Sequence, residues 1–179
     1  MNAQFKKKFL FHLLTKPQNF GFTLIELLVV IIIVGILVAV SLPNLINQVG
    51  KSRETEAKNA IGNINRAQQG YHFEKQTFTP ALTNTQLSST NSLGVIINSL
   101  YYNFSTTAGN TAQTTAKADA LSAAKDGVRP YASGVGFNST TGQYQTVICQ
   151  TDLITNNAVT VIAGTNPTCD TANGSTEIN

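Results

Sequence analysis

The pattern of apolar and polar positions starts with a run of predominantly apolar residues from Phe22 to Leu42, in which Glu26 carries the only charge. A helix of these 21 residues covers the roughly 30 Å hydrocarbon core of a bilayer. The run therefore predicts a transmembrane helix. Because a charged side chain costs about 2.5–3.5 kcal/mol at the centre of such a helix and somewhat less near its end, Glu26 requires a functional explanation.

A second pattern follows Pro43. Apolar residues recur there with the i, i+3, i+4 spacing of an amphipathic helix, and we expect this stripe to pack on the rest of the chain. The stripe consists of Leu45, Val49, Ala57, Ala60, Ile61, Ile64, Ala67 and Tyr71. We expect the charged residues of this region on its other, solvent-exposed face: Lys51, Arg53, Glu54, Glu56, Lys58 and Arg66. Turn-forming residues predict that the helix ends between residues 69 and 77.

Three later segments are rich in Val, Ile, Tyr and Phe and predict strands. They are residues 133–137, 143–150 and 158–163, with turns at 138–142 and 155–157. Before them, residues 116–125 predict a short helix that stops at Gly127, and residues 79–115 predict a long flexible loop. The fold class is therefore α+β, with one long N-terminal helix packed on a small antiparallel sheet.

Charge predicts how the chain crosses the membrane. The 21 residues before the apolar run contain Lys6, Lys7, Lys8 and Lys16 and no acidic residue, whereas the basic residues just after the run are accompanied by Glu54 and Glu56. The positive-inside rule then places the amino terminus in the cytoplasm and the carboxyl terminus outside. A secretory signal peptide is a poorer interpretation, because its apolar region has only about 7–15 residues. A plain single-pass anchor leaves Glu26 unexplained.

Residues 21–26, GFTLIE, followed by an apolar helix, resemble the class III signal of type IV prepilins and pseudopilins. The resemblance implies that prepilin peptidase cleaves between Gly21 and Phe22 and that Phe22 becomes N-methylated. It departs from the best-known pattern in its long leader and in Phe20, which stands where a basic residue is usual. The leader, GFTLIELLVV and the segment AKNAIGNINRAQQGYHFEKQTF look most like pilins of cyanobacteria.

The resemblance also implies a role for Glu26. Cleavage creates an amine one helical turn from this carboxylate, since residues i and i+4 share a helix face. In filaments of the family the glutamate pairs with the amine of a neighbouring subunit, which relieves an unpaired charge in lipid. We therefore expect Glu26 to direct assembly.

Gly35 and Pro43 are candidates for a kink or an unwound segment in the helix. Proline removes one helical hydrogen bond and clashes with the preceding turn. In filaments of the family the matching segment loses helicity. The alternative, that Pro43 only marks the exit from the membrane, fits the sequence equally well.

The two cysteines, Cys149 and Cys169, both lie in the part expected outside the cytoplasm, where disulfides form. Closing a loop of about 20 residues would stabilise the fold by roughly 3 kcal/mol. The pairing resembles the disulfide-bounded C-terminal loop of type IV pilins, and two unpaired thiols are the alternative. Major pseudopilins more often have a calcium site there, and Asp152 and Asp170 make no convincing ligand cluster.

Composition argues against several other functions. After the leader His72 is the only histidine, so enzymes built on histidine dyads or histidine metal sites lack their residues, and we expect no catalytic residue, metal or cofactor. The net charge of +3 includes the four leader lysines, and removal of the leader leaves eight basic and nine acidic side chains. Specific binding of nucleic acid is therefore not predicted.

The sequence thus predicts a pilin: a subunit that polymerises through its N-terminal helix into a surface fibre for motility, adhesion or DNA uptake. A pseudopilin or minor pilin, and a membrane-anchored binding protein, are the alternatives. Expected partners are other copies of the chain, prepilin peptidase, the inner-membrane assembly machinery and, before assembly, the inner membrane itself. The expected parts are the leader (1–21), the membrane and assembly helix (22–43), its amphipathic continuation (44–75), a variable connection (76–130), and the sheet with the disulfide loop (131–179).

Overall fold

The structure is a computed structural model that describes residues 21–152, 154 and 159–178, without the side chains of residues 46 and 47. The chain forms two compact units, Met1–Pro43 and Asn44–Asn179. Residues 1–20 of the predicted leader and the turn at 155–157 lie outside the described residues.

Helix α2 (Leu24–Lys75) has 52 residues and contains both Gly35 and Pro43. It ends within the predicted interval. Since Pro43 has no N–H, the carbonyl of Ala39 has no helical donor four residues later. Among the described residues α2 is the one helix long and apolar enough to cross a membrane, and its most apolar window has no buried residue. Within the described part of the chain, the apolar side chains of this window are therefore not covered.

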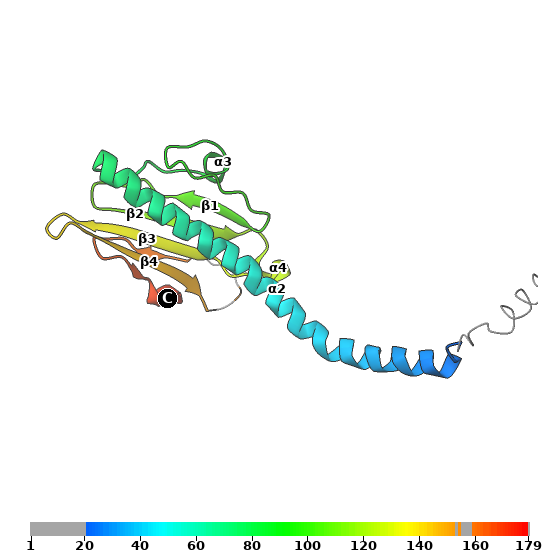
Figure 1. Ribbon diagram of the computed structural model, residues 1–179. Helices are drawn as coiled ribbons and strands as arrows, with labels where there is room; N and C mark the ends of the chain where they lie inside the picture. The colour runs from blue at the N-terminus through cyan, green and yellow to red at the C-terminus, as the bar shows by residue number, and fades with distance from the viewer. Residues whose placement is uncertain (1–20, 153, 155–158, 179) are drawn as a thin grey trace, which may run out of the picture. The chain divides into compact units, whose positions relative to one another are not determined.

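The second unit contains a five-stranded antiparallel sheet in the order β1-β2-β3-β4-β7. Its strands are β1 (Tyr102–Thr106), β2 (Gln113–Ala120), β3 (Tyr131–Asn138), β4 (Gln143–Thr151) and β7 (Ser175–Glu177). A two-stranded sheet pairs β5 (Val161–Ile162) with β6 (Thr168–Cys169). Three short helices complete the unit: α3 (Asn84–Leu87), α4 (Ala123–Asp126) and the 3-10 helix η1 (Thr171–Asn173). Within this unit, α2 runs across one face of the sheet (Figure 1).

The main core lies between α2 and this face. The helix contributes Ala57, Ala60, Ile61 and Ile64, and the sheet and its loops contribute Leu82, Leu87, Tyr102, Phe104, Ala116, Ala118, Val128 and Tyr131. Small residues on the helix and aromatic rings on the sheet fill this layer together. The burial of these apolar surfaces is the main force that holds the helix on the sheet.

Strand β3 is buried on both faces. Its alternate residues face α2, as the hydrogen bond from Ser133 to Asn65 shows, while Ala132, Gly134 and Gly136 face the C-terminal segment. A Cβ on Gly136 would overlap the carbonyl oxygens of Gly164 and Thr165. These glycines therefore let the C-terminal segment lie directly on the outer face of the sheet.

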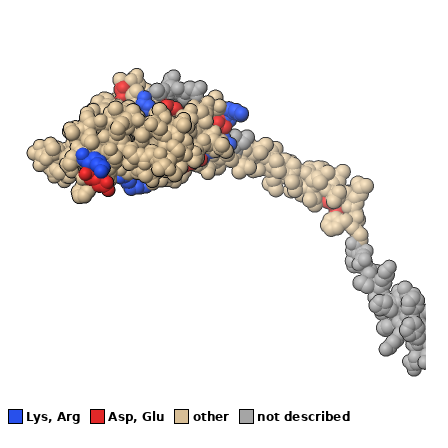
Figure 2. All heavy atoms as spheres, turned by 90° about the horizontal axis from the view of Figure 1, so that it is seen from above, with Lys and Arg blue, Asp and Glu red and all other residues tan. Residues whose placement is uncertain are grey.

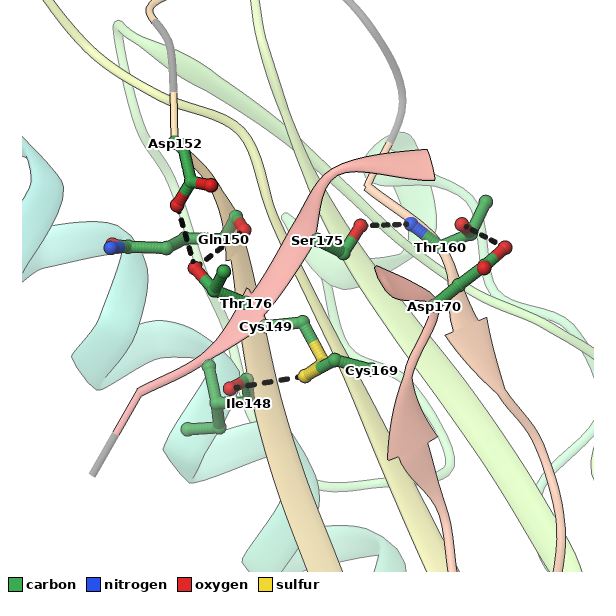
Figure 3. The surroundings of a disulfide bond; sticks show 9 residues. All are labelled: Ile148, Cys149, Gln150, Asp152, Thr160, Cys169, Asp170, Ser175 and Thr176. Atoms are coloured by element: carbon green, nitrogen blue, oxygen red, sulfur yellow. Dashed lines mark hydrogen bonds between the residues drawn. A yellow bond between two sulfur atoms is a disulfide. The ribbon is translucent and has the colours of Figure 1, made fainter. Parts of the chain in front are cut away.

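The predicted disulfide between Cys149 and Cys169 is confirmed, with an S–S distance of 2.00 Å and a Cα–Cα distance of 5.6 Å. It joins β4 to β6 within a second small core of Ala132, Val147, Cys149 and Val159 (Figure 3). The bond thus fixes the C-terminal segment on the outer face of the sheet, beside strand β7.

Two predictions for the middle of the chain were wrong. Residues 116–120, expected in a helix, belong to β2, and helix α4 occupies only Ala123–Asp126, with Gly127 as its left-handed cap at φ 64°. Residues 79–115, expected as a long flexible loop, contain α3 and β1 and the start of β2. In β2 the buried residues Thr114, Ala116 and Ala118 alternate with less buried ones, which is a weak strand signal in an alanine-rich segment. Pairing with β1 and β3 overrides its helix propensity.

The predicted apolar stripe is confirmed in its middle and wrong at its start. Ala57, Ile61 and Ile64 are fully buried, whereas Leu45 and Val49 are exposed. Glu54, expected in solvent, is buried instead, because it bonds to Arg129 of the sheet layer. The helix begins to pack on the sheet at about Gly50, which is buried.

Gly50 and Gly70, both in α2, test how closely this helix approaches the segment around Gly127. A Cβ on Gly50 would overlap the backbone carbonyl of Gly127, whereas a Cβ on Gly70 would meet nothing within 4 Å. Gly50→Ala should therefore destabilise the fold by about 1–3 kcal/mol. Gly70→Ala should stabilise it by about 0.5–1 kcal/mol, because alanine favours the helix. Urea unfolding of the full chain in neutral detergent, followed by tyrosine fluorescence, measures both changes in the free energy of unfolding. Equal effects of the two substitutions would contradict the close approach of Gly50 to the backbone of Gly127.

Candidate functional site

The expected processing site precedes α2. Gly21 and Phe22 are in non-helical backbone, and both are exposed, Phe22 to 80%. Apart from its chain neighbours, no described atom comes within 4 Å of the position that a Cβ on Gly21 would take. The peptide bond between these two exposed residues is therefore accessible in the described part of the chain.

The carboxylate of Glu26 caps the start of α2. Its Oε2 accepts hydrogen bonds from the backbone N–H of Thr23 at 2.9 Å and from the Thr23 hydroxyl at 2.8 Å. The Glu26 N–H in turn donates to the Thr23 oxygen at 3.3 Å. This reciprocal arrangement is a capping box, which satisfies donors that have no partner at a helix N-terminus. The sequence analysis missed Thr23, although Thr-x-x-Glu before an apolar run is the signal for such a box.

The capping box holds the Glu26 carboxylate at the helix end where cleavage would create an amine. The helix dipole also favours a negative charge at this end. Pairing of Glu26 with an amine, from its own chain or another, would require exchange of the Thr23 hydrogen bonds or use of the second carboxylate oxygen. The structure places Gly21, Phe22 and Glu26 within one short segment, and their roles in processing and assembly stay predictions.

A buried ion pair joins the second half of α2 to the start of β3. Arg129 donates from Nε to Oε1 of Glu54 at 2.9 Å and from Nη2 to Oε2 at 3.0 Å, and its backbone N–H also donates to Oε1 at 3.1 Å. Such a bidentate pair is stronger than a single contact and fixes the orientation of both partners. The Glu54 side chain is only 6% exposed, so the pair determines where the helix lies on the sheet.

Burial and charge act in opposite directions on the pKa of Glu54. Burial raises it, but the hydrogen bonds and the positive charge of Arg129 outweigh burial and hold the pKa of Glu54 below its usual range. The same hydrogen bonds raise the pKa of Arg129. Burial also raises the pKa of the Tyr102 and Tyr131 phenols, so both rings stay neutral beside the pair.

A second ion pair lies next to the first. Arg53 donates to the backbone oxygen of Asp126 at 2.8 Å and to its carboxylate at 3.3 Å, and its guanidinium lies 4.3 Å from the centre of the Tyr101 ring. The two adjacent residues Arg53 and Glu54 thus hold the segment 126–129 from α2. The sequence analysis missed both pairs, because residues about 75 positions apart in the chain give no local signal.

Polar contacts also fix the distal end of α2. Gln68 bonds to both the hydroxyl and the N–H of Thr79. The His72 ring lies among Phe78, Phe137 and Tyr144, with Nε2 3.0 Å from the Thr111 carbonyl and Nδ1 2.9 Å from the Tyr144 hydroxyl. Because a carbonyl only accepts, Nε2 carries the proton and Nδ1 accepts from Tyr144. His72 therefore has a structural environment.

The described residues contain no group of three or more His, Cys, Asp and Glu side chains that could hold a metal ion. Asp152 accepts from the Thr176 hydroxyl, whereas Asp170 accepts from Thr160 and Asn173 (Figure 3). These bonds lower the pKa of Asp170. The two aspartates thus have separate partners within the fold.

An exposed apolar helix segment with a capped carboxylate at its start, continued by a segment docked on a disulfide-closed sheet, is the architecture of a pilin-type protein. The family model of type IV pilin-like G and H matches residues 54–173, and the prokaryotic N-terminal methylation motif matches residues 16–42. The chain belongs to the type IV pilin-like G and H family.

Two curated relatives resemble the N-terminal part of the chain. The type IV major pilin protein PilA of Myxococcus xanthus is 41% identical over 63 residues, which cover 35% of this chain and 29% of the relative. The fimbrial protein EcpC of Eikenella corrodens is 43% identical over 60 residues, which cover 34% of this chain and 39% of the relative. The chain thus spans less than half the length of these relatives. No solved structure matches the chain.

The substitution Glu54→Gln tests the buried pair. It should destabilise the fold by about 2–3 kcal/mol at neutral pH, less than the loss of a fully buried pair because 26% of the Arg129 side chain is exposed. The pKa of Glu54 is lower in the folded state, so the stabilisation is present above its ordinary value of 4.5 and is lost as the pH falls below it.

The measurement is urea unfolding of the full chain in neutral detergent from pH 3 to pH 8. The difference in the free energy of unfolding between wild type and Glu54→Gln should shrink toward the acidic end of this range. Glu56→Gln, which removes the same charge from an exposed position of the same helix, is the matched control. Equal effects of Glu54→Gln and Glu56→Gln would show that the pair is not stabilising.

Proposed function

We propose that this protein is a structural subunit of a type IV pilus, made as a membrane-anchored precursor and polymerised through the N-terminal half of α2. The observation that carries the proposal is the match of residues 16–42 to the methylation motif, at a segment where an exposed Gly21–Phe22 bond precedes a capped Glu26. The apolar side chains at the start of α2 are exposed in the described part of the chain, and lipid or other copies of the helix would cover them.

Maturation would proceed by cleavage between Gly21 and Phe22 and methylation of Phe22 by prepilin peptidase. The inner-membrane assembly machinery would then receive a subunit whose domain lies outside the cytoplasm. Glu26 would exchange its bonds with Thr23 for the methylated amine of a neighbouring subunit. The favourable exchange of a costly carboxylate in lipid for an ion pair would drive extraction of the subunit.

The composition of residues 76–179, the part of the second unit that follows α2, suits a fibre of closely packed copies. Residues 76–179 contain only eight charged side chains, and Figure 2 shows few blue or red atoms on the visible face of this unit. Such copies repel one another little. In the fibre, Gly35 and Pro43 would be the places where α2 bends or unwinds. The resemblance to cyanobacterial pilins stays a prediction, as do motility, adhesion and DNA uptake.

The proposal is tested first by the intact mass and N-terminal sequence of the protein sheared from the surface of its native cells. A chain that starts at methylated Phe22 is expected. A chain that starts at Met1 or after Ser41 would contradict processing by prepilin peptidase. Abundant long fibres of this chain distinguish a major pilin from a pseudopilin or minor pilin.

The role of Glu26 is tested by Glu26→Gln, which keeps the shape and the capping acceptor but loses the charge. A charge-assisted hydrogen bond contributes about 1.5–3 kcal/mol, so incorporation into fibres should fall about 10-fold to 100-fold. Immunoblots of sheared fibres and of membranes measure this ratio, and processed subunit should accumulate in the membrane. Glu56→Gln is the control. Normal fibre yield from Glu26→Gln would rule out the role of this charge in assembly.

A further inference from the structure

The unit formed by residues 44–179 contains an open groove of about 800 Å³ that the proposed fibre function does not use. One side of the groove is α2, through Val49, Lys51, Arg53 and Glu54. The other side is the turn around α4 and the end of β4: Ala124, Lys125, Asp126, Gly127, Arg129, Asp152 and Ile154. We propose that this groove binds the phosphate headgroup of an anionic glycerophospholipid on the outer surface of the membrane, before the subunit enters a fibre.

The groove is lined by four basic and three acidic side chains, a net charge of +1, and two of the basic groups are lysines. Arg53 and Arg129 are neutralised by Asp126 and Glu54, and Asp152 accepts a hydrogen bond from Thr176 at 3.0 Å. Within the described part of the chain neither Lys51 nor Lys125 forms an ion pair, and both are exposed. Two ammonium groups without a partner on opposite sides of one groove complement a single phosphate.

The groove also has an apolar edge. Val49 is 43% exposed and Ile154 is 51% exposed, although both line the same hollow as the lysines. A free phosphate would not use these residues, whereas a phospholipid presents its glycerol and upper acyl atoms directly beside its phosphate. Mixed cationic and apolar side chains are typical of protein surfaces that lie at a membrane interface.

The sequence keeps this groove close to the membrane. Lys51 follows Pro43 by eight residues, which amount to about 12 Å along a helix. Each headgroup layer is about 5–7 Å thick, and a lysine side chain extends its charge beyond the helix toward it. The distance between Pro43 and Lys51 is set by the number of residues that join them, so it holds for any arrangement of the two units. Lys and Arg atoms next to Asp and Glu atoms are visible at the end of the unit from which α2 continues toward residue 43 (Figure 2).

Binding of this kind would hold the second unit at the membrane surface while the subunit waits for assembly. An attraction of about 1 kcal/mol per lysine near an anionic surface corresponds to about fivefold in occupancy for each. Binding of this strength would be weak enough for the lipid to dissociate when the subunit leaves the bilayer. The inference rests on the membrane-anchored stage of the proposed function.

The test uses the processed chain, residues 22–179, in lipid nanodiscs of phosphatidylcholine alone or with 30% phosphatidylglycerol. Hydrogen exchange of residues 123–129 should slow in the discs that contain phosphatidylglycerol. Lys51→Gln combined with Lys125→Gln should abolish this difference, and lysine-to-arginine changes at both positions should retain it. Lys75→Gln combined with Lys117→Gln removes the same charge elsewhere in the unit and should leave the difference unchanged.

Several outcomes would overturn the inference. Equal protection in both kinds of disc would show that the groove does not recognise lipid charge. Protection by 10 mM inorganic phosphate in phosphatidylcholine discs, as strong as that by phosphatidylglycerol, would identify a site for free anions. Protection that appears only when fibres form would assign the groove to an acidic partner on another copy. Failure of the chain to enter discs of phosphatidylcholine would instead contradict the anchored state itself, which separates the two proposals.

Discussion

The docking of the second half of α2 on the sheet is the interaction on which the rest of this structure depends. From Gly50 to His72 the helix supplies one face of the core, and strands β1 to β4 supply the other. Without the helix, Tyr102, Phe104 and Tyr131 would expose their rings to water, and a sheet of this size would have one bare apolar face. The single helix therefore links the stability of the domain to the exposed apolar segment at the start of the same helix.

Hydrophobic burial alone would hold the helix without fixing its register. A stripe of alanine and isoleucine tolerates sliding and rotation, because its contacts are non-directional. The directional contacts are the bidentate pair between Glu54 and Arg129 at one end and the bonds of Gln68 and His72 at the other. Leaving any of these buried groups unpaired costs free energy, so only one position of the helix satisfies them all.

The sequence predicted those features that have a local or compositional signal. The apolar run, the end of α2, the β3–β4 hairpin and the disulfide follow from hydropathy, turn residues and the cysteine pair. Strand β2 was missed because its pattern of Thr and Ala is equally compatible with a helix until its two neighbouring strands pair with it. Glu54 was misplaced because a charged residue is buried only when a distant partner meets it, and no local pattern reveals Arg129.

The capping box at the start of α2 gives Glu26 a partner before any other subunit is present. In lipid, a carboxylate that accepts two hydrogen bonds from Thr23 costs less than a bare one, since part of its lost hydration is replaced. In the proposed membrane-anchored precursor, this capping would lower the free-energy cost of the carboxylate. The hydroxyl and the amide of Thr23 carry no net charge, so they would stabilise the carboxylate less than an ion pair. The remaining difference in free energy would favour pairing of Glu26 with a positive amine, so the capped carboxylate would be tolerated in the bilayer and would still favour assembly.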